Sequence, residues 1–162
     1  MVLYSELKDF EVYSKLGEKR GSVNDLIVDL STWNIKNLII SPSMLKKNVL
    51  YKQGDVKEVN ESKKRFIIPG ELEEQDVPEI STFNMAFADS ELIGKDVVSK
   101  DNQDVGKVYD FDVPLKLENW MVWKILIKRG IKERRLRVSP DEIESISDKI
   151  VLKKTISEID ND

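Results

Sequence analysis

Residues 104–113 read DVGKVYDFDV, and a related stretch, KRGSVNDLIV, stands at residues 19–28. Both contain the pattern Gly-x-Val-x-Asp followed by further apolar residues. An ungapped alignment of residues 5–29 with 90–114 gives 10 identities in 25 positions. After a two-residue insertion the match continues, so that Trp33 meets Trp120. Two copies of one unit, each of about 70 residues, are the simplest explanation.

Each copy is written mostly as β-structure. Short stretches rich in Val, Ile, Leu and aromatic residues are separated by turn residues, a pattern typical of a small barrel or sandwich. A short helical turn is expected at QGDVKEV in the first copy and at SPDEIESI in the second, with Pro140 in its first turn and Ser139 as its cap. The predicted fold class is therefore mostly β, with two small β-barrels in tandem and a short helical turn in each.

The shared strand contains a conflict of side-chain alternation. Val23 and Asp25 share one parity, whereas the later apolar residues Leu26 and Val28 have the opposite parity. Strict alternation would send one of these sets to solvent. A bulge or a sharp bend would bury both sets, and small barrels need such bends. The glycine of the motif indicates a place where the backbone turns or another strand comes close.

The repeat divides the chain into segments of different composition. The stretch between the copies holds two prolines and a run of acidic residues, as a linker does, and the acidic tail is expected to be frayed. The predicted segments are a first repeat at 1–68, an acidic linker at 69–90, a second repeat at 91–155 and an acidic tail at 156–162.

Composition excludes several classes of function. The chain has 162 residues, 40% hydrophobic and 35% charged, with a net charge of −4, which does not suit a domain that binds nucleic acid through gross positive charge. It has no cysteine, which excludes disulfides and thiolate metal sites, and no histidine, the commonest general base. The first residues lack the apolar core of a signal peptide, and no apolar run approaches the roughly 20 residues of a membrane span. We therefore expect a cytoplasmic, non-enzymatic protein without cofactor or direct membrane insertion.

A family resemblance rests on the second copy. The stretches LIGKDVVSKDNQDVGKVYDFDV, VWKILIK and RLRVSPDEIESISDKIVL, all within residues 91–154, resemble a PRC-barrel domain. The family's pattern is an opening strand, a turn, Gly-x-Val-x-Asp, an apolar strand, a proline-led turn with I-x-x-I and a closing strand. Residues 6–68 match the same pattern mainly in their first half. The chain is thus similar to tandem PRC-barrel proteins, and most similar to small archaeal ones.

The resemblance implies binding rather than catalysis. Some small archaeal members resemble adaptors in FtsZ-based cell division that act with SepF-type membrane anchors. This implies protein partners of the SepF-like division class and recruitment to the division site. Another branch of the family implies the alternative, an RNA- or ribosome-associated maturation factor. A homodimer formed through unpaired sheet edges also stays open.

A basic hairpin is the candidate binding site. The stretch KILIKRGIKERRLRV, residues 124–138, predicts two strands with a turn near Arg129-Gly130. Three interpretations stay open: a docking edge for an acidic partner segment, an edge that binds an anion or RNA, or basic side chains that guard an edge strand against unwanted pairing. Base stacking has little support because no aromatic residue is interleaved with the arginines. The candidate partner-binding residues are Lys128, Arg129, Lys132, Arg134, Arg135 and Arg137.

Two aspartates and two tryptophans occupy matching places in the copies. Asp25 and Asp110 could act as a base or hold a metal, but no histidine or second convergent acid accompanies them. We therefore expect each carboxylate to cap a turn or pair with a basic neighbour, and we expect no catalytic or metal site. Trp33 and Trp120 share a place in both copies, which favours a common structural role.

Overall fold

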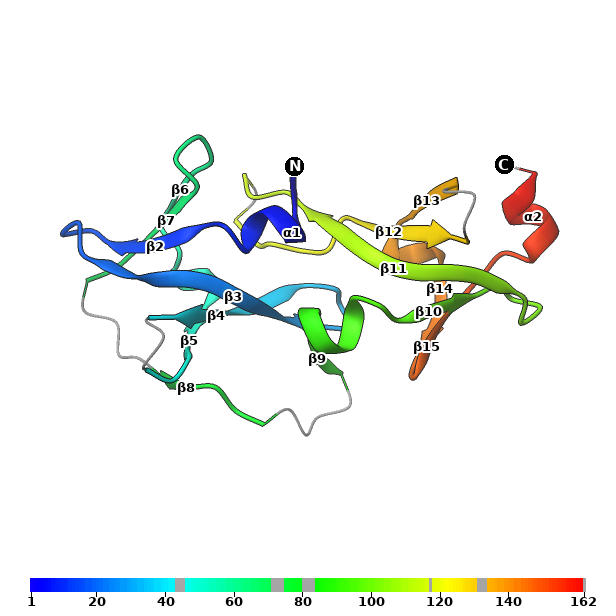
Figure 1. Cartoon of the computed structure of the whole chain (residues 1–162), viewed down its shortest axis with the longest axis horizontal. Helices are drawn as coiled ribbons and strands as arrows, with labels where there is room; N and C mark the ends of the chain where they lie inside the picture. Colours follow the sequence, from blue (N-terminus) through cyan, green and yellow to red (C-terminus); the bar gives the residue numbers. More distant parts are fainter. Residues whose placement is uncertain (43–45, 71–74, 80–83, 117, 131–133, 162) are drawn as a thin grey trace.

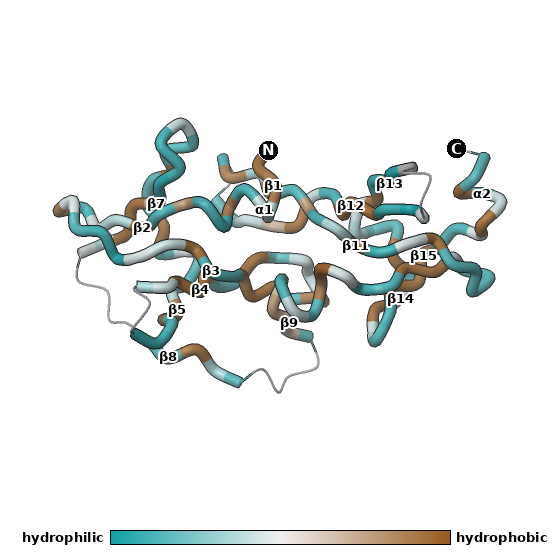
Figure 2. The backbone as a smooth tube through the Cα atoms, in the orientation of Figure 1, coloured by the Kyte–Doolittle hydropathy of each residue, from teal (hydrophilic) through white to brown (hydrophobic). Residues whose placement is uncertain are grey.

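The computed structural model describes residues 1–42, 46–70, 75–79, 84–116, 118–130 and 134–161, with the side chain of Arg134 left out. Two β-sheets lie along the long axis of the molecule (Figure 1), and hydrophobic stretches concentrate in their strands, whereas the hairpin between β6 and β7 is hydrophilic (Figure 2). This confirms a mostly β fold of two tandem units with short helical pieces. None of the described helices is long and apolar enough to cross a membrane.

The first half supplies most of one sheet, whose strand order is β6-β7-β2-β3-β4-β5-β8. The elements of this half are β1 (Val2–Leu3), α1 (Tyr4–Leu7), β2 (Glu11–Ser14), β3 (Lys19–Asp29), β4 (Ile35–Ser41), β5 (Val49–Lys52), η1 (Gln53–Asp55), β6 (Glu58–Asn60), β7 (Arg65–Ile68) and β8 (Gln75–Asp76).

The second half supplies most of the other sheet, in the order β13-β12-β11-β10-β15-β14. Its elements are β9 (Met85–Phe87), the π-helical turn η2 (Ala88–Leu92), β10 (Asp96–Val98), β11 (Asp104–Val113), β12 (Lys124–Arg129), β13 (Arg134–Val138), η3 (Pro140–Glu142), β14 (Ile143–Ile146), β15 (Lys149–Leu152) and α2 (Ile156–Asp160). Ser139 and Glu142 form a capping box around Pro140, as the sequence predicts for η3.

A β-bulge in each long strand resolves the conflict of alternation. The register between β3 and β4 shifts between Val23 and Asp25, and the register between β11 and β12 shifts at the equivalent place. The extra residue turns both sets of side chains inward, so that Val23, Asp25, Leu26 and Val28 are all buried. The predicted bulge is therefore confirmed in both copies.

Each sheet contains a strand from the other copy. The first half of β3 pairs with β2, and its last residues pair with β9 from the second copy. In the other sheet β11 pairs with its own β10 and then with β1 from the first copy. The helical turn that follows each exchanged strand, α1 or η2, also lies near the middle of the molecule (Figure 1). The copies thus interlock by exchanging their N-terminal segments.

The exchange is accompanied by a symmetric backbone contact. The amide of Ile35 donates to the carbonyl of Trp120 at 2.9 Å, and the amide of Val122 donates to the carbonyl of Trp33 at 2.8 Å. Asn34 and Met121 form an isolated antiparallel bridge between these two hydrogen bonds. Swapping the copies turns one hydrogen bond into the other, which defines a pseudo-two-fold axis through the bridge.

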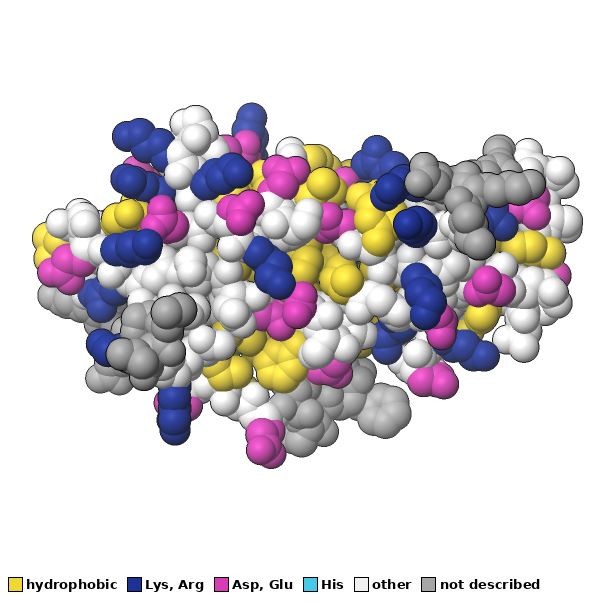
Figure 3. Space-filling model, in the orientation of Figure 1, with side chains coloured by type: hydrophobic (Ala, Val, Ile, Leu, Met, Phe, Trp, Pro, Cys, Tyr) yellow, Lys and Arg dark blue, Asp and Glu magenta, His cyan; other side chains and the backbone are white. Residues whose placement is uncertain are grey.

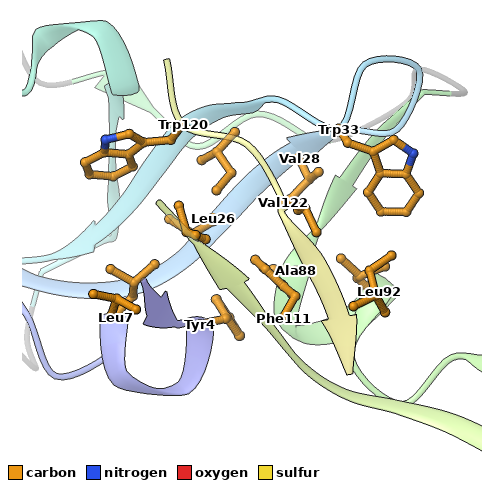
Figure 4. Close-up of a cluster of buried hydrophobic side chains, with 14 of the residues drawn as sticks. Tyr4, Leu7, Leu26, Val28, Trp33, Ala88, Leu92, Phe111, Trp120 and Val122 are labelled. Atoms are coloured by element: carbon orange, nitrogen blue, oxygen red, sulfur yellow. The ribbon is translucent and has the colours of Figure 1, made fainter. Parts of the chain in front are cut away.

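One continuous core follows from this arrangement. Leu7 and Leu92, from the two exchanged turns, are both completely buried among side chains of the two sheets (Figure 4). Trp33 and Trp120 are buried as well, which confirms their shared structural role. The ring of Trp120 lies 5.0 Å from that of Phe66 in the first copy, measured between centroids. The hydrophobic driving force therefore acts across the boundary between the copies.

The stretch expected as a linker contains two paired strands, β8 and β9. In the stretch expected as a linker, β8 pairs with β5 and β9 pairs with β3, while 71–74 and 80–83 lie outside the described residues.

The expectation of a frayed tail is wrong. Residues 156–160 form α2, capped by a Thr155–Glu158 capping box, and Ile159 is buried. A cap and one apolar anchor suffice to order this short helix.

Candidate functional site

The aspartates of the two Gly-x-Val-x-Asp motifs hold the exchanged segments. Asp110 accepts hydrogen bonds from the amide of Ser5 at 3.2 Å and from its hydroxyl at 2.5 Å. Asp25 accepts in the same way from the amide of Asp89 at 3.0 Å. Ser5 and Asp89 are the second residues of α1 and η2, whose first amides have no partner within the helix. Each aspartate therefore caps the turn contributed by the other copy.

Asp25 also accepts two further hydrogen bonds, one from the hydroxyl of Tyr4 at 2.8 Å and one from the amide of Leu26 at 2.8 Å. Burial nevertheless raises the pKa of Asp25 above its ordinary value, because removal from water disfavours the charged form more than these hydrogen bonds favour it. Burial and the neighbouring Asp25 raise the pKa of the Tyr4 hydroxyl as well. Both groups serve as hydrogen-bonding partners in the core rather than as an exposed acid or base.

The raised pKa of Asp25 predicts a pH effect on stability. The folded chain binds the proton of this group at a higher pH than the unfolded chain does, so its contribution is largest below the unfolded pKa and falls as pH rises through the folded pKa. The substitution Asp25→Asn removes the titrating carboxyl group, and with it this contribution, but keeps a side-chain oxygen that can accept hydrogen bonds. We expect the free energy of unfolding of the wild type, minus that of Asp25→Asn, to decrease as pH rises from about 3.5 towards neutrality. Urea unfolding across this range measures it, and a difference that grew with pH would contradict the assignment.

The basic hairpin is present, but two of its arginines are engaged within the chain. Arg129 forms an ion pair with Asp160 at 2.7 Å and donates to the carbonyl of Val105. Arg137 forms an ion pair with the buried Asp112 at 3.0 Å, although its side chain is 64% exposed. The guanidinium of Arg135 lies 4.5 Å from the ring centre of Tyr109. Arg129 therefore holds α2 against the hairpin, and the exposed cations of the hairpin lie along β12 and β13.

Two of the predicted residues cannot be placed in the site. Lys132 lies outside the described residues, and so does the side chain of Arg134, although the backbone of Arg134 belongs to β13. Lys128 is exposed on β12. Of the six candidate residues, Lys128 and Arg135 are brought together, since they face each other across β12 and β13.

A third cation, which the sequence reasoning missed, joins these two. Lys107 on β11 pairs with Lys128 on β12, which pairs in turn with Arg135 on β13. Residues directly opposite on neighbouring strands share a face of the sheet. Lys107, Lys128 and Arg135 thus form a row of three exposed cations, which we call the basic row; the ammonium of Lys107, at the inner end of the row, is ion-paired with Asp96 of β10 at 3.1 Å. Lys107 lies 21 positions before Lys128 in the sequence, so the sequence alone does not show that the two residues are neighbours. Only the register of the strands brings them together.

The first copy carries no such row at the equivalent place. Ser22 pairs with Ser41 there. The side chain of Asn48 donates a hydrogen bond to Asn24 at 3.4 Å, and the equivalent residues of the second copy, Arg135 and Tyr109, are also in contact. The residues that correspond to Lys107, Lys128 and Arg135 are Ser22, Ser41 and Asn48. Like charges directly opposite one another on a sheet are unfavourable. At these three equivalent places the second copy therefore carries positive charge, whereas the first copy carries neutral polar residues.

A cleft between the copies is another feature that the sequence did not reveal. It has a volume of about 750 Å³ and is lined by Gln53 and Lys57 from the first copy and by Lys116, Asn119 and Trp120 from the second. Gln53 bridges its walls, donating to the carbonyl of Glu118 and accepting from the amide of Trp120. Within the described part of the chain, no group of three or more acidic side chains could hold a metal ion, here or elsewhere.

A comparison with family models agrees with this architecture. The model of the PRC-barrel domain matches residues 1–75 and again residues 85–159. The chain belongs to the PRC-barrel family. A search of the curated proteins finds no match to it. Each matched PRC-barrel segment begins with the strand that is exchanged, β1 in the first and β9 in the second. The PRC-barrel fold is in general an interaction or scaffold fold, which directs attention to surfaces rather than cavities.

Proposed function

We propose that this PRC-barrel protein is a non-enzymatic adaptor that binds protein partners through the basic row. The single observation that carries the proposal is the difference between the copies. Lys107, Lys128 and Arg135 replace neutral polar residues at equivalent places of one fold. Lys128 and Arg135 on adjacent strands, spaced by about 4.8 Å, with Lys107 beyond them in its ion pair with Asp96, give a positively charged surface that is complementary to an acidic partner.

The interlocked core supports the same proposal. Because the exchanged segments fix one copy against the other, the basic row is held on a rigid platform rather than on an independent module. On the face seen in Figure 3, hydrophobic side chains gather in the middle, and charged ones lie on both halves. A chain with two related but chemically different halves suits an adaptor, which must hold its partners at a fixed distance.

The finer part of the proposal is the process. By family resemblance we propose a role in archaeal FtsZ-based cell division, with a SepF-type membrane anchor as the partner that recruits the protein from the cytoplasm to the division site. The alternative, an RNA- or ribosome-associated factor, would use the same cations against phosphate groups. No observation favours it over the adaptor, so it enters as an outcome of the test.

Charge reversal in the basic row tests the adaptor. We expect Lys128→Glu with Arg135→Glu to weaken capture of the host's SepF-type protein by the full chain about tenfold or more, because two attractive charges become repulsive. The matched control is Lys63→Glu with Lys64→Glu, at the exposed turn between β6 and β7, which changes net charge equally. The measurement is affinity capture with purified components, with and without nuclease.

Two results would overturn the proposal. Equal weakening by both double variants would mean that net charge alone governs capture. Binding that disappears with nuclease, together with steep loss of affinity for RNA in added salt, would favour the RNA-associated alternative.

A further inference from the structure

An edge strand of the second copy has a counterpart that is already covered in the first. In the first sheet, β5 pairs on its outer side with β8, where Val49 lies opposite Asp76 and Leu50 opposite Gln75. The strand β8 belongs to the acidic segment ELEEQDVPE at residues 71–79. The described part of this segment that pairs with β5, the strand Gln75–Asp76, is therefore the native partner of this edge in one copy (Figure 1).

The register identifies β13 as the counterpart of β5. Ile39 pairs with Leu50 between β4 and β5, and Leu126 pairs with Arg137 between β12 and β13. The helical turns η1 and η3 follow the two strands at the same spacing. In the part of the chain that the structure describes, β13 ends its sheet, and no strand pairs with its outer side. The backbone groups on that side can pair with an added strand.

The charge of the open edge is complementary to the segment that covers the other one. Arg135 and Arg137 are exposed on β13, on either side of Leu136, and Arg137 is also ion-paired with the buried Asp112, whereas the counterpart strand β5 begins with Val49 and Leu50. Lys128 lies on the neighbouring strand β12, and Lys107 lies one strand further in, on β11. We propose that β13 binds an acidic, extended segment of a partner protein, which adds to the sheet as an antiparallel strand. This rests on the proposed adaptor function and specifies how its partner is recognised.

Other occupants suit the edge less well. A second copy of β13 would bring Arg135 and Arg137 against the same arginines, and like charges opposite one another are unfavourable. The acidic tail of the chain is already folded as α2, with Asp160 paired to Arg129. A nucleic acid would use the cations but not the amide and carbonyl groups of the edge, which only another backbone complements.

The test uses the chain's own covering segment as the probe. A synthetic peptide with the sequence of residues 71–79 is titrated into the full-length, ¹⁵N-labelled protein, and binding is followed through the amide signals of β13. Two further peptides carry N-methyl groups on alternate residues, one at Glu73, Gln75 and Val77, the other at Leu72, Glu74 and Asp76. Both keep every charge, but each loses the hydrogen-bond donors of one edge.

Strand addition predicts a result that depends on the edge. The unmodified peptide shifts the signals of β13, one N-methylated peptide loses binding, and the other keeps its affinity within about threefold, because only one edge of an added strand faces the protein. Lys128→Glu with Arg135→Glu weakens the unmodified peptide about tenfold, and Lys63→Glu with Lys64→Glu does not. Equal binding of both N-methylated peptides, no binding of any peptide, or shifts confined to other strands would overturn the inference.

The outcomes separate this inference from the proposed function. If the peptide fails while the charge-reversed variant still loses the division protein, strand addition is wrong and the adaptor function stands. If the peptide adds to β13 as described while capture of the division protein is unaffected by charge reversal, the proposed partner is wrong.

Discussion

Replacing Gly106 with alanine should destabilise the protein by about 3 kcal/mol or more. A Cβ atom at this position would lie 2.1 Å from the carbonyl oxygen of Lys128 on the neighbouring strand, so that the backbone of β12 would have to move. The φ angle of 156° is a second obstacle, since side-chain-bearing residues rarely adopt it. The first copy has the same geometry, with Gly21 against the carbonyl of Ser41. The glycine of the motif is therefore required by the close approach of two strands.

Urea unfolding of Gly106→Ala measures this loss. The matched control is Gly54→Ala in η1, where a Cβ atom would meet no other atom within 4 Å. We expect the control to remain within about 0.5 kcal/mol of the wild type. Equal stability of Gly106→Ala and Gly54→Ala would mean that β11 and β12 do not approach as described.

Replacing Trp120 with alanine should cost about 3–5 kcal/mol, the range for a large aromatic residue removed from a core. Its side chain is 1% exposed and packs against Phe66 of the first copy, so the cavity would open between the copies. Its backbone carbonyl, which alanine keeps, accepts the hydrogen bond from Ile35, so the cavity would lie beside this contact. The loss should therefore weaken the contact between the repeats as well as the second repeat itself.

Trp123→Ala is the control for this second prediction, because Trp123 lies three residues away and is 44% exposed. We expect it to cost about 1 kcal/mol or less, as nearly half of its surface is already in water. Thermal unfolding followed by far-ultraviolet circular dichroism compares the two variants. Similar losses for Trp120→Ala and Trp123→Ala would show that Trp120 does not anchor a shared core.

The repeat and its strands could be predicted because local patterns in the sequence indicate them. The identical spacing of Gly21 and Asp25 with Gly106 and Asp110 revealed the duplication. The clash of parity in the same strand required a bulge, which the structure contains in both copies. Alternation and glycine constrain the backbone over a few residues, and such constraints are legible in one sequence.

The exchange of segments could not be predicted in this way. Val2–Leu3 and Met85–Phe87 are short apolar strands that would fit the edge of either sheet. With the strands exchanged, Leu7 and Leu92 are buried in the shared core, and such tertiary packing has no local signature in the sequence. The capping role of Asp25 and Asp110 follows from the exchange, so the sequence predicted a cap but not the segment that is capped.

The candidate site was predicted in part for the same reason. Charge density marks the hairpin in the sequence, and Lys128 and Arg135 do face each other there. Lys107 enters the basic row through strand pairing, which composition does not reveal. Arg129 looks like its neighbours in the sequence, yet its ion pair with Asp160 anchors α2. The division between exposed and engaged cations depends on the fold of the whole chain.

Hydrogen–deuterium exchange of Gly106→Ala tests most directly the claim that the two repeats form one interlocked platform. The substitution lies in β11 of the second copy, and protection is read in β2, β3 and β4 of the first. A single cooperative unit predicts that these first-copy strands lose protection by the same free energy as β11 and β12, since both open only by global unfolding. First-copy strands that keep wild-type protection while the second copy opens would contradict the account.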